Sequence, residues 1–99
     1  MIARMWTGVV RRADADEYTE YIERTGIAEY KQTPGNQGVY FLRRDFDGDK
    51  SEFRTFTLWE SLDAVKAFAG EDYEKAKYYP EDERFLLEQD PHVLHFEVV

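Results

Sequence analysis

The sequence predicts a single α+β domain of the ferredoxin-like class, and three observations lead to that prediction. Extended, apolar-rich segments stand at both ends of the chain and as a pair in its middle, and segments with helical spacing separate them. A short polar turn joins the middle pair. The length of 99 residues is sufficient for one core. We therefore expect residues 1–99 to form one unit with the order β-α-β-β-α-β, its helices on one face of a four-stranded antiparallel sheet.

The first part of the chain is expected to form a strand and then an interrupted helix. Met1–Arg11 has an extended pattern. Asp14 is typical of a helix N-cap, and Glu17 three residues later completes a capping box. Apolar residues then recur at helical spacing. Gly26 is expected to loosen or kink this helix, which resumes through Ile27–Lys31.

The middle of the chain predicts an antiparallel hairpin. Pro34-Gly35-Asn36 has the composition of a turn. Val39–Phe46 and Glu52–Glu60 are rich in the β-branched and aromatic residues that favour strands. The tight connection Asp47-Gly48-Asp49 is expected to join these two strands.

The second half begins with a helix that Ser61 caps and Gly70 ends. The acidic stretch that follows predicts two short helical pieces, Asp72–Lys77 and Glu81–Leu87. His92–Val99 is expected to be the closing strand.

The composition excludes several classes of function. With 21 Asp and Glu residues against 13 Lys and Arg, the formal charge is −8, which repels phosphate backbones and anionic lipid. Cysteine is absent, so no disulfide or thiolate nucleophile is expected. The longest apolar run, Val39–Leu42, is far shorter than the roughly 20 residues that span a bilayer. We expect a cytoplasmic protein that binds neither nucleic acid nor membranes.

No metal site is expected. His92 and His95 are three residues apart in a strand, so they point to opposite faces and cannot share an ion. The acidic cluster Glu81-Asp82-Glu83 is more typical of a solvated helix start than of a calcium site.

Both faces of the predicted sheet are largely apolar, which predicts a homodimer. In the third strand, one face carries Phe53 and Trp59, and the other carries Phe56 and Leu58. Two helices cannot cover both faces of such a sheet. The open face is therefore expected to meet a second copy of itself, because monomers rarely expose apolar patches of that size.

Several local strings resemble the antibiotic biosynthesis monooxygenase (ABM) family. They are Leu58-Trp59-Glu60-Ser61, then Val65, Phe68 and Gly70, then Tyr78-Tyr79-Pro80-Glu81-Asp82, and last Val93-x-His95-Phe96-Glu97-Val98. The resemblance covers essentially the whole chain and implies a dimeric α+β barrel. The superfamily includes cofactor-free monooxygenases of polyketide quinones, haem-degrading enzymes, isomerases and members with no assigned activity.

The resemblance implies a cofactor-independent monooxygenase that acts on a small aromatic, phenolic or quinone-like compound. Trp59 matches a tryptophan that the quinone and haem branches share at the end of the third strand. The haem branch also uses an Asn on the first strand and a His after the Trp motif. Here Asn36, the only Asn, lies in a turn, and Lys77 stands near the position of that His. Haem degradation is thus disfavoured, and a non-catalytic small-molecule binding protein is the alternative.

An aromatic pocket with a few polar groups would suit such chemistry. Trp59 and Trp6 are expected to stack on the ligand, His95 to act as the base and Arg4 to hold an anionic oxygen. Further candidates for binding are Thr57, Phe68, Tyr73 and Tyr78.

Each assignment has a structural alternative. Trp59 is expected to belong to the core at the junction of sheet and helix whatever else it does. Trp6 also suits a dimer interface, and His95 also suits a hydrogen-bonded structural role. Arg4 is placed to pair with a carboxylate such as Glu97 on a neighbouring strand. Amphipathic packing alone would explain the tyrosines of the expected helices, Tyr18, Tyr21, Tyr73, Tyr78 and Tyr79.

Overall fold

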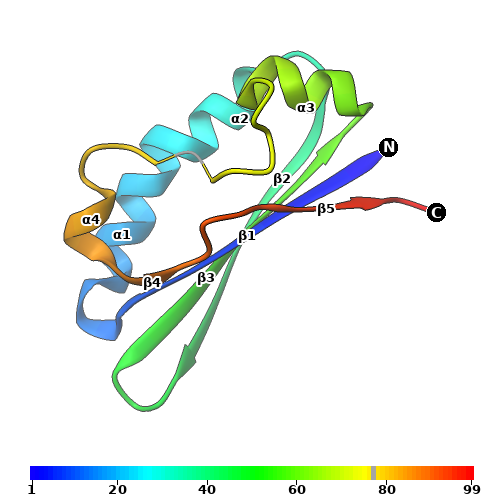
Figure 1. Cartoon of the computed structure of the whole chain (residues 1–99). Helices are drawn as coiled ribbons and strands as arrows, with labels where there is room; N and C mark the ends of the chain where they lie inside the picture. Colours follow the sequence, from blue (N-terminus) through cyan, green and yellow to red (C-terminus); the bar gives the residue numbers. More distant parts are fainter. Residues whose placement is uncertain (77) are drawn as a thin grey trace.

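In the computed structural model, which describes residues 1–76 and 78–99, helices lie on one side of an antiparallel sheet (Figure 1). The strands follow the order β2-β3-β1-β4, and β5 also pairs with β1. Their bounds are Ile2–Arg11 for β1, Asn36–Phe46 for β2, Lys50–Trp59 for β3, Leu86–Gln89 for β4 and Leu94–Glu97 for β5. The predicted ferredoxin-like α+β class is confirmed.

The strand expected at the C-terminal end of the sheet is divided in two. β5 pairs with Ile2–Met5 at the start of β1, whereas β4 pairs with Gly8–Val10 further along the same strand. Together β4 and β5 occupy the single position that a four-stranded sheet would give to one strand. The expected closing strand, His92–Val99, is therefore shorter, because its regular part is β5 alone.

The long helical region is interrupted where the sequence predicted. α1 (Ala15–Ile22) continues into a π-helical turn, η2 (Glu23–Ile27), and then into α2 (Ala28–Gln32). Gly26 lies inside the π-helical turn. The hydroxyl of Thr25 also donates a hydrogen bond to the carbonyl oxygen of Tyr21 at 2.8 Å, a local bond that competes with regular helix geometry.

The capping box predicted at the start of α1 is wrong. Asp14 is the last residue of the short 3₁₀ turn η1 (Arg12–Asp14) and directly precedes α1. Its carboxylate accepts a hydrogen bond from Arg11 Nε at 2.9 Å instead of capping the backbone. Glu17 pairs with Arg84 at 2.6 Å. The cap predicted for α3 (Leu62–Ala69) is confirmed, since Ser61 Oγ accepts from Ala64 N at 3.1 Å.

The hairpin is confirmed, and its turn has the backbone that the sequence requires. Phe46 pairs with Lys50 across the connection. Asp47 and Gly48 both have positive φ, 54° and 75°, a conformation that suits Asp and Gly. Gly70, with φ of 83°, ends α3 as expected.

The helix predicted over Asp72–Lys77 is wrong for the residues described, and Lys77 itself lies outside them. Residues 71–74 form turns, and Lys75 forms an isolated antiparallel bridge with His92. Val93 N donates to Glu74 O at 2.7 Å and Ala76 N donates to Pro91 O at 3.0 Å. Pairing with the 91–93 segment thus satisfies backbone groups that a helix would have satisfied internally.

The helix predicted over Glu81–Leu87 is partly wrong. Its helical part is α4 (Asp82–Phe85), after which the chain extends into β4. Leu86 pairs with Val10 of β1, so the edge of the sheet provides backbone partners for this segment. Pairing along β1 therefore outweighs the local helical preference.

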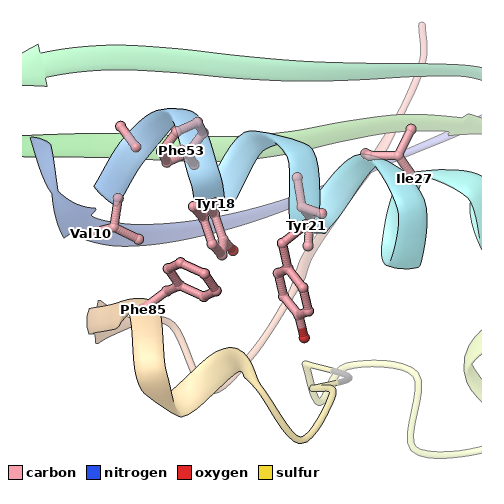
Figure 2. Close-up of a cluster of buried hydrophobic side chains, with 8 residues drawn as sticks. Val10, Tyr18, Tyr21, Ile27, Phe53 and Phe85 are labelled. Carbon is pink, nitrogen blue, oxygen red and sulfur yellow. The ribbon is translucent and has the colours of Figure 1, made fainter. Parts of the chain in front are cut away.

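Two hydrophobic clusters lie between the sheet and the helices. The first fills the space beneath α1 and α4, where the Tyr18 ring centroid is 5.0 Å from that of Phe53 and 5.4 Å from that of Phe85 (Figure 2). The second contains Trp59, Ala64 and Val65 and lies under α3. Tyr30 packs against both clusters.

The opposite face of the sheet is not covered by helices (Figure 1). The register of β1 against β3 places Arg4 opposite Thr57 and Trp6 opposite Thr55. These residues are buried on the helix side, a side that strand parity alone did not decide. Large apolar side chains remain exposed on the other face, namely Tyr40 at 55%, Leu42 at 47%, Leu94 at 57% and Phe96 at 51%. We call these four residues the open-face patch.

Candidate functional site

A cavity lies on the helix side of the sheet, where the two hydrophobic clusters meet. Its floor comes from β1 and β3 through Arg4, Trp6 and Thr55. Its walls come from the long helical region, from α3 and from the segments that follow α3, and include Tyr18, Tyr30, Phe68, Tyr78, Tyr79 and Asp82. The volume of about 40 Å³ holds a few water molecules. A larger ligand therefore needs some of these side chains to move.

Arg4 places a buried positive charge at the cavity. The side chain is 2% exposed, and its Nη1 donates to Tyr73 O at 2.7 Å and to His95 Nε2 at 3.1 Å. Its guanidinium carbon lies 5.7 Å from the centroid of the Phe68 ring. Burial lowers the pKa of Arg4, and the nearby Tyr30 hydroxyl partly opposes this effect.

The charge of Arg4 is not neutralised within the described part of the chain. None of the carboxylates described there forms an ion pair with its guanidinium, and Nε has no hydrogen-bond partner among them. The predicted alternative of a pair with Glu97 is wrong, because Glu97 lies opposite Ile2 in the register. A buried cation without a counter-charge favours the binding of an anionic group.

His95 lies beside Arg4 and behind the cavity wall. It faces Arg4 across the β1–β5 pair, and its ring centroid is 5.2 Å from that of Tyr73. A guanidinium only donates hydrogen bonds, so Nε2 of His95 is the acceptor and the ring proton is on Nδ1. Burial, and then the charge of Arg4, lower the pKa of His95, so the ring is neutral at pH 7.

Trp6 and Tyr78 line the cavity as a hydrogen-bonded pair. Trp6 Nε1 donates to the Tyr78 hydroxyl at 3.0 Å and to Asp90 O at 3.2 Å, and the same hydroxyl donates to Asp90 O at 2.6 Å. The ring centroids are 6.1 Å apart in an edge-to-face arrangement. These bonds fix the orientation of both aromatic rings at the cavity.

Trp59 and Thr57 support the cavity from below without lining it. Trp59 is fully buried, and its Nε1 donates to Thr57 Oγ1 at 2.8 Å. The hydroxyl of Thr57 donates in turn to Arg4 O at 3.4 Å. Trp59 also contacts Phe68, whose ring centroid is 5.5 Å away.

The predicted site residues therefore gather in one region, but some line the cavity and others contact the lining residues from outside it. Arg4, Trp6, Phe68 and Tyr78 line the cavity. His95, Thr57 and the backbone of Tyr73 contact Arg4 from outside it, and Trp59 contacts Thr57 and Phe68. The last four residues are positioned to orient the lining rather than to touch a ligand.

The sequence interpretation missed several lining residues, and three of them, Tyr18, Tyr30 and Asp82, carry polar groups that matter for the site. Tyr18 and Tyr30 come from the helical region, where tyrosines were expected only to pack. Asp82 was expected in a solvated helix start, which is wrong because it is 4% exposed. Its Oδ2 accepts a hydrogen bond from Tyr79 N at 2.5 Å, three residues earlier.

Two further searches concern metals and membranes. Across residues 1–76 and 78–99, no group of three His, Asp or Glu side chains is arranged to hold a metal ion. His92 is exposed and pairs through its backbone with Lys75, away from His95. No helix in the described part of the chain has both the length and the apolar character needed to cross a membrane.

The fold and the cavity define a class, the small ferredoxin-like α+β proteins with a pocket between sheet and helices. No family model matches the sequence. No curated protein matches it either. Similarity to known proteins is therefore found through solved structures.

Three solved structures illustrate this similarity. A Bacillus cereus protein provisionally named an antibiotic biosynthesis monooxygenase matches with a TM-score of 0.68 and 18% identity, over 98% of this chain and 89% of that one. The heme-degrader MhuD from Mycobacterium tuberculosis matches with a TM-score of 0.59 and 22% identity, over 100% of this chain and 96% of that one. A Chloroflexus aurantiacus J-10-fl protein, also provisionally named an antibiotic biosynthesis monooxygenase, matches with a TM-score of 0.57 and 13% identity, over 100% of this chain and 94% of that one. The chain therefore shares its ferredoxin-like α+β domain fold with these structures, and the dimeric barrel stays a prediction.

Proposed function

We propose that this chain is a cofactor-independent monooxygenase that oxidises a small aromatic, phenolic or quinone-like compound with O2. The observation that carries the proposal is the buried guanidinium of Arg4, which has no carboxylate partner among the described residues and faces a cavity lined by aromatic rings. Aromatic walls bind a planar ring, and a buried cation stabilises an oxyanion on that ring. The name of the Bacillus cereus structure is consistent with this activity.

The proposed reaction needs little from the protein beyond binding and electrostatics. A phenolate or enolate substrate is itself the reductant, so that one oxygen atom is inserted into the substrate and the other leaves as water. Arg4 holds the developing oxyanion, and the walls of the cavity exclude water. His95 keeps the guanidinium in place through its Nε2 acceptor, 3.1 Å away, and is a positioning residue in this scheme.

Oxygen uptake tests the proposal directly. Purified protein is mixed with a panel of hydroquinones and naphthols, and O2 consumption is followed with an electrode. We expect Arg4→Met to lower kcat/KM about a hundredfold, because one oxyanion donor is lost from a site with few others. Arg12→Met is the matched control, since Arg12 is exposed and does not line the cavity. Equal rates for wild type and Arg4→Met would contradict the role of Arg4.

The alternative is a non-catalytic protein that binds small molecules in the same cavity. The observation that favours it is the position of the only histidine near the site. His95 does not line the cavity, and its Nε2 lone pair is already occupied by Arg4. Ligand binding by calorimetry without O2 uptake for any member of the panel would favour this alternative.

Haem degradation is a separate activity that one structural neighbour carries in its name, with two hemes bound in its active site. This chain lacks an Asn on β1. Titration with haem, followed through the Soret band, distinguishes this activity from the oxidation of small aromatics. A saturable shift of that band would favour haem as the substrate.

The proposal includes a homodimer formed through the open face of the sheet. The open-face patch is bordered by Met5, Phe56 and Leu58, which are partly buried on the same face. These side chains form a band across β2, β3, β1 and β5. A second copy of the same face would cover them, as the sequence predicted.

A further inference from the structure

One carboxylate oxygen at the cavity has no partner. Asp82 is 4% exposed and lines the cavity, and its Oδ2 accepts from Tyr79 N at 2.5 Å. Its Oδ1 is buried and, among the described residues, has no hydrogen-bond partner. An unpaired buried carboxylate oxygen costs free energy unless a donor completes it. The arrangement therefore favours a ligand that brings a donor.

The groups around Asp82 do not replace that donor. Tyr21 has its ring between α1 and α4 (Figure 2). Burial, and then the nearby carboxylate of Asp82, raise the pKa of the Tyr21 hydroxyl to about 12. The geometry of a hydrogen bond is nevertheless not met, because the hydroxyls of Tyr18 and Tyr21 have no partners among the described residues either. The aromatic rings make this end of the cavity apolar around one acidic group. Burial raises the pKa of Asp82, and the nearby Tyr21 hydroxyl offsets only part of this rise, so its carboxylate is a stronger base than an exposed one.

Arg4 and Asp82 line the same cavity but have neighbours in different hydrophobic clusters, and we infer from this that they lie toward different ends of it. Arg4 contacts Phe68 and Tyr73, which pack against the cluster under α3. Asp82 is surrounded by Tyr18 and Tyr21 of the cluster under α1. The two charged groups form no ion pair. One end therefore recognises an anionic oxygen, and the other recognises a hydroxyl.

We propose that Oδ1 of Asp82 binds a hydroxyl group of the aromatic ligand and takes up its proton, an inference that rests on the proposed function of the cavity. The O–H bond of the ligand breaks, the proton passes to Oδ1, and the electron pair stays on the ligand oxygen. The ligand becomes a phenolate, the electron-rich form that reacts with O2. Asp82 is thus the base that His95 was expected to be.

The ligand class follows from the two ends. It is a flat aromatic compound with an acidic oxygen at one end of the ring and a hydroxyl group at the opposite end. Hydroquinones have this arrangement, and so do para-hydroxylated aromatic acids. A ring with only one of the two groups satisfies either Arg4 or Asp82 and leaves the other unpaired.

The first test compares two probes on the wild-type protein by calorimetry. 4-Hydroxybenzoate has both groups, and 4-methoxybenzoate keeps the carboxylate but has no hydroxyl proton. We expect the hydroxyl compound to bind about tenfold more tightly, the ratio for one hydrogen bond to a charged acceptor. Its ultraviolet absorption is expected to move to longer wavelength on binding, because the phenol hydroxyl donates a strong hydrogen bond to the carboxylate.

The second test compares two variants that each remove one negative charge. Asp82→Asn keeps an acceptor for Tyr79 N but is no longer a base, and we expect it to lose both the tenfold preference and the spectral shift. Glu83→Gln is the matched control, because Glu83 is exposed one residue further along α4. A wild-type protein that binds both probes equally, or an Asp82→Asn protein that keeps the preference and the shift, would overturn the inference. If neither probe nor any hydroquinone binds the wild type, the proposed function itself fails.

Discussion

The contact between His95 and Arg4 makes the stability of the fold depend on pH. Burial and the adjacent guanidinium lower the pKa of His95 below its usual 6.5, while Glu74 has a weaker opposite effect. The folded state thus keeps the imidazole neutral at a pH where the unfolded chain takes up a proton. The unfolded state binds more protons in that range, so the free energy of unfolding falls as the pH drops through 6.5.

This pH dependence can be measured by urea unfolding at pH 7.5, 6.5 and 5.5. We expect the wild type to lose stability over this range and His95→Gln to lose less, because Gln has an acceptor for Arg4 but no titrating group. His92→Gln is the control, since His92 is exposed. A pH profile of His95→Gln that matches the wild type would contradict the assignment. Asp82 has the opposite effect on stability at lower pH. Because burial raises its pKa, the folded state takes up a proton before the unfolded state does, and this contribution raises the free energy of unfolding as the pH falls.

Single residues also show how far the site could be predicted from the sequence. Arg4 and Trp6 could be assigned to one face by strand parity alone, and both line the cavity. Asp82 could not, because its burial depends on how the segment after Pro80 folds back over α1. Strand parity did not decide which face of the sheet His95 shares with the cavity, and the register of β5 against β1 brings its Nε2 to Arg4 rather than to the cavity.

At the scale of the elements, β1 carries a glycine on which the position of Trp6 depends. A Cβ atom at Gly8 would lie 2.4 Å from Cη2 of the Trp6 indole and 3.0 Å from Cδ2 of Leu86. The indole therefore packs over the backbone of Gly8, two residues along the same strand face. We expect Gly8→Ala to destabilise the fold by about 1–3 kcal/mol, the usual cost of overpacking.

A double-mutant cycle with Trp6→Phe tests this contact. The clashing atoms belong to the six-membered ring of the indole, and the shorter Phe ring is expected to relieve the clash, so that Gly8→Ala costs much less in the Trp6→Phe background. Gly38→Ala in β2 is the control, because the nearest atom to its added Cβ would be 3.5 Å away. Additive free energies in the cycle would show that Gly8 does not act through Trp6.

Elements were predicted well where local signals and tertiary pairing agree. β1, the hairpin, the interrupted helix and the cap of α3 follow from spacing, turn residues and Ser61. The segments after Gly70 were predicted poorly, because their backbone partners are distant in sequence. Glu74 bonds to Val93, and Leu86 pairs with Val10, contacts that no local pattern encodes.

At the scale of the whole molecule, charge and apolar surface are separated between the two sides. The helical region carries a large share of the acidic residues, including Asp16, Glu17, Glu20, Glu23 and Glu29. On the open face, Glu52 is paired with Arg44 at 3.2 Å and with Arg54 at 3.1 Å. A chain with a net charge of −8 can therefore meet a second copy through this face without bringing its acidic surfaces together.

This separation predicts a dimer that one substitution can dissociate. Sedimentation velocity is expected to show a dimer for the wild type at micromolar concentration. Phe96→Glu is expected to raise the dissociation constant about a hundredfold or more, because a carboxylate would be buried without a partner in the interface. Gln32→Glu adds the same charge on an exposed residue of α2 and serves as the control. Circular dichroism checks that both variants are folded.

A wild-type protein that sediments as a monomer would contradict the dimer, and so would a Phe96→Glu variant that dissociates no more than Gln32→Glu. The cavity lies on the helix side and is formed by one chain, so ligand binding by a monomeric Phe96→Glu variant would remain measurable.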